Sequence, residues 1–73
     1  MKLARVIRSD SPWVVCDPQA GAIVRCAPAV GAIVQYEDDY GAHRVYFPGV
    51  SGAARIGVHL FREYFKDLDD ETS

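Results

Sequence analysis

The dipeptide Gly-Ala recurs at nearly even intervals along the chain, and each copy precedes a short run rich in residues that favour β-strands. The copies are Gly21-Ala22, Gly31-Ala32, Gly41-Ala42 and Gly52-Ala53. Short, evenly spaced strands that each follow a turn residue are typical of an antiparallel meander that closes into a barrel or folds into a sandwich. The repeat therefore predicts an architecture and says little about chemistry.

Residues that favour strands alternate with turn residues along most of the chain. Strands are expected over residues 2–8, 13–16, 22–27, 32–36, 43–47 and 54–59. Prolines at positions 12, 18 and 28 mark turns or sheet edges, because proline cannot donate to a β-ladder. The acidic segment 37–41 is expected to be a hairpin loop, and residues 47–52 a more flexible loop.

The period of the apolar pattern changes near the C-terminus. Apolar residues at 60, 61, 64, 65 and 68 follow helical spacing, which predicts a short helix of about two turns over Leu60–Leu68. The alternative is a 3₁₀ turn followed by a closing strand from Tyr64 to Leu68. Residues 69–73 are mostly acidic and are expected to form a flexible, solvated tail.

The length of 73 residues limits the chain to one domain, which we place at residues 1–68. Apolar residues make up 49% of the sequence, which argues against disorder and leaves apolar surface for a partner or a second copy. A net charge of −2 gives no overall attraction to nucleic acid or to anionic lipid.

The N-terminus carries no apolar stretch long enough for a signal peptide, and no segment approaches the length of a membrane span. We therefore expect a cytoplasmic protein that does not engage a membrane. In that compartment two cysteines such as Cys16 and Cys26 are more often reduced than bridged. The alternative is a disulfide between them across a hairpin.

Strand alternation assigns side chains to two faces. The inward set is Ala4, Val6, Val24, Cys26, Val34, Tyr36, Val45, Phe47, Ile56 and Val58. The outward set is Leu3, Arg5, Ile7, Ile23, Arg25, Ile33, Gln35, Arg44, Tyr46, Arg55 and His59. The outward face is unusual because it mixes arginines with large apolar side chains, whereas an ordinary solvent face is mostly polar.

Three explanations fit this mixed outward face. In the first, the C-terminal helix covers part of it and the arginines extend around the helix. In the second it is a protein interface, with partner-binding residues Trp13, Tyr40, Arg44, Tyr46 and Arg55. In the third it binds nucleic acid through Arg5, Arg25, Arg44, Arg55 and Tyr46, which the net negative charge opposes.

Aromatic and aliphatic side chains suggest two further surfaces. One is a groove beside the 37–41 loop, lined by Trp13, Tyr36, Tyr40, Tyr46 and Phe47. The other is a homodimer surface formed by Leu3, Ile7, Ile23 and Ile33, which is compatible with either kind of partner.

Motifs for catalysis and metal binding find little support in the sequence. Cys16, Cys26, His43 and His59 have zinc-ligand chemistry, but their spacing suits no compact zinc site. No nucleophile and base stand in a recognisable setting, and the evenly spaced glycines make turns rather than a phosphate cradle. We therefore expect no enzyme, no catalytic residue, no cofactor and no metal.

Segments Arg5–Trp13, Val30–Val34, Arg44–Phe47, Gly57-Val58 and Tyr64–Leu68 occur in an order that resembles the SH3-like small barrels. The order is most similar to the peripheral proteins of photosynthetic complexes that dock electron carriers, such as those of photosystem I. Residues 14–29 have no counterpart there, so they are expected to form an added hairpin or a near-duplicate of the next strand. The resemblance implies a barrel and no particular function, because such barrels serve as adaptors, nucleic-acid modules and accessory subunits.

The sequence thus predicts a mainly β domain, an SH3-like antiparallel barrel of five or six strands with a short C-terminal helix. The alternative is an α+β fold in which the helix packs on one face of an antiparallel meander. The expected function is non-enzymatic protein binding, as an accessory subunit, an adaptor or a small inhibitor of a larger complex, including inhibitors encoded by phages. The alternative function is nucleic-acid binding through the arginine and tyrosine face.

Overall fold

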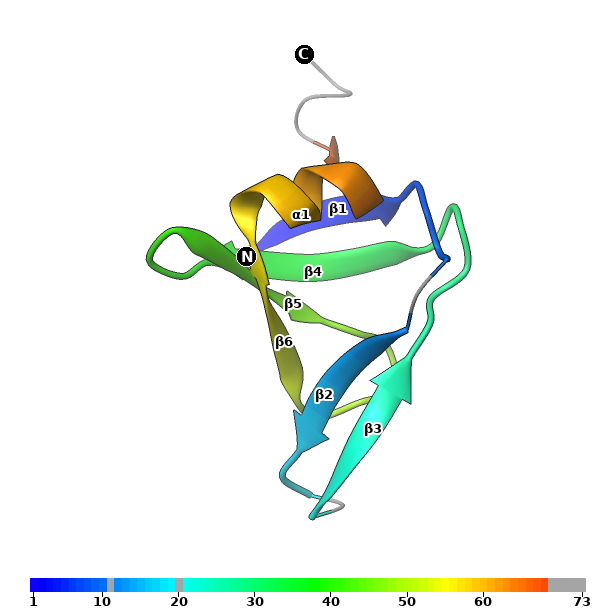
Figure 1. Cartoon of the computed structure of the whole chain (residues 1–73), viewed down its shortest axis with the longest axis vertical. Helices are drawn as coiled ribbons and strands as arrows, with labels where there is room; N and C mark the ends of the chain where they lie inside the picture. Colours follow the sequence, from blue (N-terminus) through cyan, green and yellow to red (C-terminus); the bar gives the residue numbers. More distant parts are fainter. Residues whose placement is uncertain (11, 20, 69–73) are drawn as a thin grey trace.

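The computed structural model of the chain describes residues 1–10, 12–19 and 21–68, which form strands and one short helix (Figure 1). The strands are β1 (Lys2–Val6), β2 (Trp13–Asp17), β3 (Ala22–Cys26), β4 (Ile33–Asp38), β5 (Ala42–Tyr46), β6 (Ala53–Gly57) and β7 (Phe65–Asp67). The helix α1 spans Val58–Tyr64. The mainly β class and the short helix near the C-terminus are confirmed, and the predicted tail at 69–73 lies outside the described residues.

The strands form two separate antiparallel sheets. The larger sheet has five strands in the order β6-β5-β4-β1-β7, and β2 pairs with β3 in a two-stranded sheet. The expected closure into a barrel is therefore wrong. Strand β2 contacts β6, but the two strands belong to different sheets, so the ladder around the core is interrupted there. The segment 14–29 is largely the separate hairpin formed by β2 and β3.

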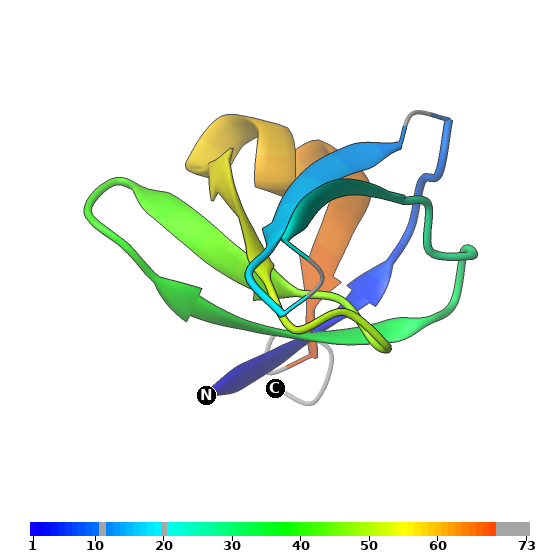
Figure 2. The ribbon, with the colours of Figure 1, turned by 90° about the horizontal axis from the view of Figure 1, so that it is seen from below.

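The core lies between the inner face of the five-stranded sheet, the helix and the β2–β3 hairpin (Figure 2). Most of the side chains predicted to point inward are buried: Ala4, Val6, Val34, Tyr36, Val45, Phe47 and Ile56. Val24, Cys26 and Val58 are only half-buried. The hairpin contributes Val15, which is fully buried, and Trp13, whose ring packs edge-on against Tyr64 at 5.0 Å.

The C-terminal segment combines the two alternatives that the sequence left open. The helix begins at Val58 rather than Leu60, so strand β6 ends earlier than expected, and the chain becomes extended again at Phe65. Strand β7 then pairs with β1, with Phe65 opposite Val6. The rings of Phe61 and Phe65 stack with centroids 5.0 Å apart, so both fill the core although only one is helical. Their spacing therefore mimicked that of a longer helix.

The helix does not cover the outward face of the five-stranded sheet. Phe61 is buried against the rings of Tyr36 and His43, which places the helix on the core side. On the opposite face Leu3 and Ile33 remain 43% and 41% exposed. The explanation that the helix screens this mixed face is therefore wrong, and the face is open.

The last Gly-Ala copy has a different physical basis from the other three. Gly21, Gly31 and Gly41 have positive φ angles and lie in turns, as the repeat predicts. Gly52 is buried beside β2, and a Cβ atom there would overlap the carbonyl oxygen of Cys16. This close approach of two backbones holds the β2–β3 hairpin against the start of β6.

We expect Gly52→Ala to lower the free energy of unfolding by about 2–3 kcal/mol, because backbone atoms have to separate to admit the methyl group. Urea unfolding measures the loss. Gly57→Ala is the matched control, because nothing lies within 4 Å of a Cβ atom at Gly57. Equal stability of the Gly52→Ala and Gly57→Ala variants would contradict this role of Gly52.

A charged contact ties the segment after β1 to the end of the helix. Arg8 donates from Nε to Asp10 Oδ2 at 2.8 Å and lies over the ring of Tyr64, 5.1 Å from its centroid. Hydrogen bonds from Tyr64 first and from Arg8 second hold the pKa of Asp10 below its ordinary value. The ionised carboxylate is therefore the form that the folded protein favours.

A group whose pKa is lowered by folding adds stability above its unfolded pKa, and this stability is lost as the pH falls through the folded value. We therefore expect Asp10→Asn to lower the unfolding free energy near neutral pH and to make no difference in strong acid. Urea unfolding of both proteins across this range measures the difference. A deficit that is the same at every pH would show that ionisation of Asp10 is not the cause.

Candidate functional site

The two-residue turn between β4 and β5 of the five-stranded sheet presents an exposed aromatic side chain, that of Tyr40. Asp39 and Ala42 exchange two backbone hydrogen bonds of 2.9 and 3.2 Å, which leaves Tyr40 and Gly41 as the two residues of the β4–β5 turn. Their φ angles are 45° and 80°, as in a type I′ turn. Tyr40 is the only described residue other than glycine with a positive φ. Its side chain is 97% exposed, so packing does not offset the strain of this conformation.

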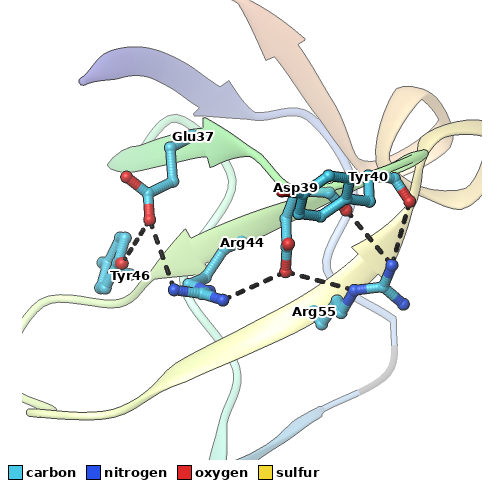
Figure 3. A network of polar contacts seen from close by, with 6 residues as sticks. All are labelled: Glu37, Asp39, Tyr40, Arg44, Tyr46 and Arg55. Atoms are coloured by element: carbon cyan, nitrogen blue, oxygen red, sulfur yellow. Dashed lines mark hydrogen bonds and ion pairs between the residues drawn. The ribbon is translucent and has the colours of Figure 1, made fainter.

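Arg55 of β6 braces this turn from the neighbouring strands (Figure 3). Its Nη2 donates to the backbone oxygens of Asp39 at 3.2 Å and of Tyr40 at 3.1 Å, while its Nε donates to Asp39 Oδ2 at 3.2 Å. The Asp39 side chain is only 16% exposed. The guanidinium therefore fixes the carbonyl groups of Asp39 and Tyr40 and one carboxylate, which restricts the backbone that carries Tyr40.

Arg44 of β5 extends the same network toward the middle of the sheet. It contacts Asp39 Oδ2 at 3.2 Å and Glu37 Oε1 at 3.6 Å, and the Tyr46 hydroxyl donates to Glu37 Oε1 at 2.8 Å (Figure 3). A hydrogen bond with Tyr46, followed by the charge of Asp39, raises the pKa of Arg44. The result is one connected polar surface that alternates cations and acids across three strands.

A groove begins where this network ends. It has a volume of about 420 Å³ and is lined by Leu3, Ile33, Val34, Gln35, Tyr46, Phe47, Pro48 and Val50. Tyr46 belongs to both features, because its hydroxyl bonds to Glu37 while its side chain lines the groove. The sequence analysis predicted only a flexible loop over residues 47–52, so it missed this groove. The available signal was Pro48 directly after the aromatic residue Phe47.

The structure brings together four of the five predicted partner-binding residues. Tyr40, Arg44, Tyr46 and Arg55 share the outward network, whereas Trp13 packs against Tyr64 and Phe65 on the core side. The expected aromatic groove beside the turn is therefore not formed. Two of its other members, Tyr36 and Phe47, are buried in the core.

The arginines proposed for nucleic acid do not share one sheet. Arg5, Arg44 and Arg55 lie on strands of the five-stranded sheet with Tyr46, whereas Arg25 lies on β3 of the separate hairpin. Arg44 and Arg55 already contact the carboxylate of Asp39. A phosphate would have to compete with this carboxylate.

The predicted homodimer surface is also divided between features. All four of its residues are exposed, but they lie at different places: Leu3, Ile7, Ile23 and Ile33. Leu3 and Ile33 line the groove, and Ile7 lines a separate pocket with Tyr36 and Phe61. Ile23 lies on β3.

Groups with metal or nucleophile chemistry are dispersed. Across residues 1–10, 12–19 and 21–68, no three His, Cys, Asp or Glu side chains gather as metal ligands. His43 packs against the rings of Tyr36 and Phe61, with Nδ1 at 3.0 Å from Asp38 Oδ1.

The two cysteines are free thiols that do not face each other. Cys16 lies opposite Ile23 and Cys26 opposite Trp13, so the register does not support the disulfide considered from the sequence. Burial, with a smaller contribution from Asp17, raises the pKa of Cys26, which keeps its thiol protonated.

Comparisons with protein-family models, with curated proteins and with solved structures return no match. The resemblance to SH3-like barrels therefore stays a prediction. Among the described elements, no helix is long and apolar enough to cross a membrane.

We expect Tyr40→Asn to raise the free energy of unfolding by about 1 kcal/mol, because asparagine adopts the left-handed conformation more readily than tyrosine. Thermal and urea unfolding measure the gain. Tyr40→Val is the matched control: it also removes the exposed ring, but a β-branched side chain disfavours this conformation and should lower stability. Equal effects of the two substitutions would show that strain at Tyr40 is not significant.

Proposed function

We propose that this chain is a non-enzymatic protein-binding module whose contact surface is the outward face of the five-stranded sheet, centred on the Tyr40 turn. Within this proposal it acts in the cytoplasm as an accessory subunit, an adaptor or a small inhibitor of a larger complex. The observation that carries the proposal is the side chain of Tyr40, which is almost wholly exposed at a position that strains its backbone.

Folding gives no reason for a tyrosine at this position. Glycine, asparagine or aspartate would form the same turn at lower cost, and the ring makes no packing contact that offsets the strain. Tyrosine is, however, among the side chains that contribute most to protein interfaces. A strained and exposed tyrosine therefore supports a role in contact with another molecule.

The surroundings of Tyr40 suit a preorganised contact. Arg55 holds the turn, and Arg44 and Tyr46 are fixed by the acids on β4 and in the turn. Binding to side chains that are already ordered costs little conformational entropy. The groove beside Tyr46 adds an apolar site into which a partner side chain can insert.

The same contacts favour a protein over a nucleic acid. The carboxylates of Glu37 and Asp39 accompany Arg44 and Arg55, so this surface is nearly balanced in charge. Nucleic-acid binding depends on cations that neutralise phosphates. A balanced network with an exposed tyrosine fits the mixed rim and core of a protein interface better.

The test compares the wild-type chain with its Tyr40→Asn variant as baits for affinity capture from lysate of the native host, with and without nuclease. We expect one protein that is recovered in stoichiometric amount from both lysates by the wild type and is lost with Tyr40→Asn. Because the substitution should stabilise the fold, loss of capture cannot be attributed to unfolding.

Val30→Ser is the control bait, because Val30 is also exposed, at 65%, but is absent from the network and the groove. It should capture the same protein as the wild type. Capture that survives Tyr40→Asn would reject the Tyr40 surface as the contact site. Capture that disappears with nuclease would favour the nucleic-acid alternative.

A further inference from the structure

Strand β3 has one edge that is unpaired within the described chain. Its residues pair with β2 in an unbroken register from Ala22 opposite Asp17 to Cys26 opposite Trp13. Across the described residues, β3 belongs to no other ladder, and it lies at the periphery of the molecule with β2 between it and β6 (Figure 1). An edge of this kind is a template for another strand.

The usual protections of an edge strand are weak at β3. The register shows no bulge, the strand contains no proline, and its outward face has one charge, on Arg25. Ile23 is 71% exposed, and Val14 on the neighbouring strand is 61% exposed, so the two-stranded sheet presents two large aliphatic side chains to solvent. Apart from Arg25, the outward face of the hairpin is therefore apolar, and it is continuous with the edge.

The hairpin that carries this edge is held firmly in place. Val15 is fully buried, Trp13 packs against Tyr64 and Phe65, and Gly52 lies against the backbone of Cys16. The edge is thus presented by a fixed element, so pairing with it requires little ordering of this chain.

We propose that β3 is a homodimerisation edge, which pairs antiparallel with β3 of a second copy about a two-fold axis at Ile23. Directly opposed residues of an antiparallel ladder point to the same face of the sheet, so a two-fold axis perpendicular to the sheet has to lie between two copies of the same residue. An axis at Arg25 would set two arginines directly opposite each other. An axis at Val24 would leave them as diagonal neighbours, which is also unfavourable.

The axis at Ile23 avoids both charge contacts. Ile23 then faces Ile23 of the second copy and Ala22 faces Val24, while Arg25 extends past the paired residues toward the turn at Gly21, which has no side chain to obstruct it. The two arginines are separated by four positions, roughly 13 Å along the strand. The outward row across the joined sheets becomes Cys16, Ile23, Ile23 and Cys16, because Cys16 lies opposite Ile23 within each hairpin.

A second copy suits this edge because identical edges joined by a two-fold axis close each other in one step. The axis at Ile23 brings apolar side chains together and keeps the arginines apart, so this pairing carries no unfavourable charge contact. A short interface of this kind buries less than the roughly 1,200 Å² of a standard complex, so a weak, concentration-dependent dimer is expected.

The test measures oligomeric state by sedimentation equilibrium and strand register by cross-linking. We expect wild type to dimerise as its concentration rises and Ile23→Lys to remain monomeric, because two lysines would then face each other. Native thiols are removed by Cys16→Ser and Cys26→Ala. Adding Ile23→Cys to that background should give a covalent dimer on mild oxidation, since directly opposed Cβ atoms lie about 5 Å apart.

Val14→Cys in the same background is the matched control, because Val14 is similarly exposed but lies on β2, away from the axis. It should not cross-link under the same conditions. A wild-type monomer at all concentrations would overturn the proposal, including the case in which β3 accepts a strand from a different protein. A dimer that resists Ile23→Lys, or whose Ile23→Cys form does not cross-link, would overturn it equally. Tyr40 takes no part, so this outcome is independent of the proposed partner-binding function.

Discussion

One five-stranded sheet has two faces, and a chain of 73 residues has little material to cover them. Here the helix and the β2–β3 hairpin both cover the inner face, where Phe61 and Val15 are buried with the sheet residues. The outer face therefore stays open, and its polar network and groove exist because nothing else in the described chain packs there. Because the inner face is covered, the outer face is the one that remains available for the proposed contact.

The alternation of apolar residues predicted the strands and most of the core, because side-chain direction in a strand depends only on local geometry. The sequence offered an added hairpin over residues 14–29 as one alternative, but it could not reveal that the β2–β3 hairpin stays outside the larger sheet and leaves the ladder around the core interrupted. That outcome depends on Gly52 and Cys16, whose contact joins positions far apart in the chain. The same limit applies to Phe65, which fills the core from a strand although its spacing from Phe61 is helical.

The candidate site was partly accessible from the sequence. Arginines and a tyrosine on alternate positions of neighbouring strands predicted that Arg44, Tyr46 and Arg55 share a face, and the structure places them there. Their pairing with the acids of the 37–41 segment was not predicted, since that segment was expected only to form a hairpin loop. The surroundings of Trp13 were not predicted for a related reason: a tryptophan after a proline has the composition of an interface anchor, and only the tertiary fold brings Tyr64 beside it.

The position of Trp13 has a practical consequence. It is the only tryptophan in the chain, and it lies at the junction between the hairpin and the C-terminal segment, against Tyr64 and Phe65. Its intrinsic fluorescence therefore reports on the docking of the hairpin, without an added dye. Detachment of the hairpin from an otherwise folded sheet would expose the indole ring to water and shift its emission to longer wavelength, separately from any change in the far-ultraviolet circular dichroism of the strands.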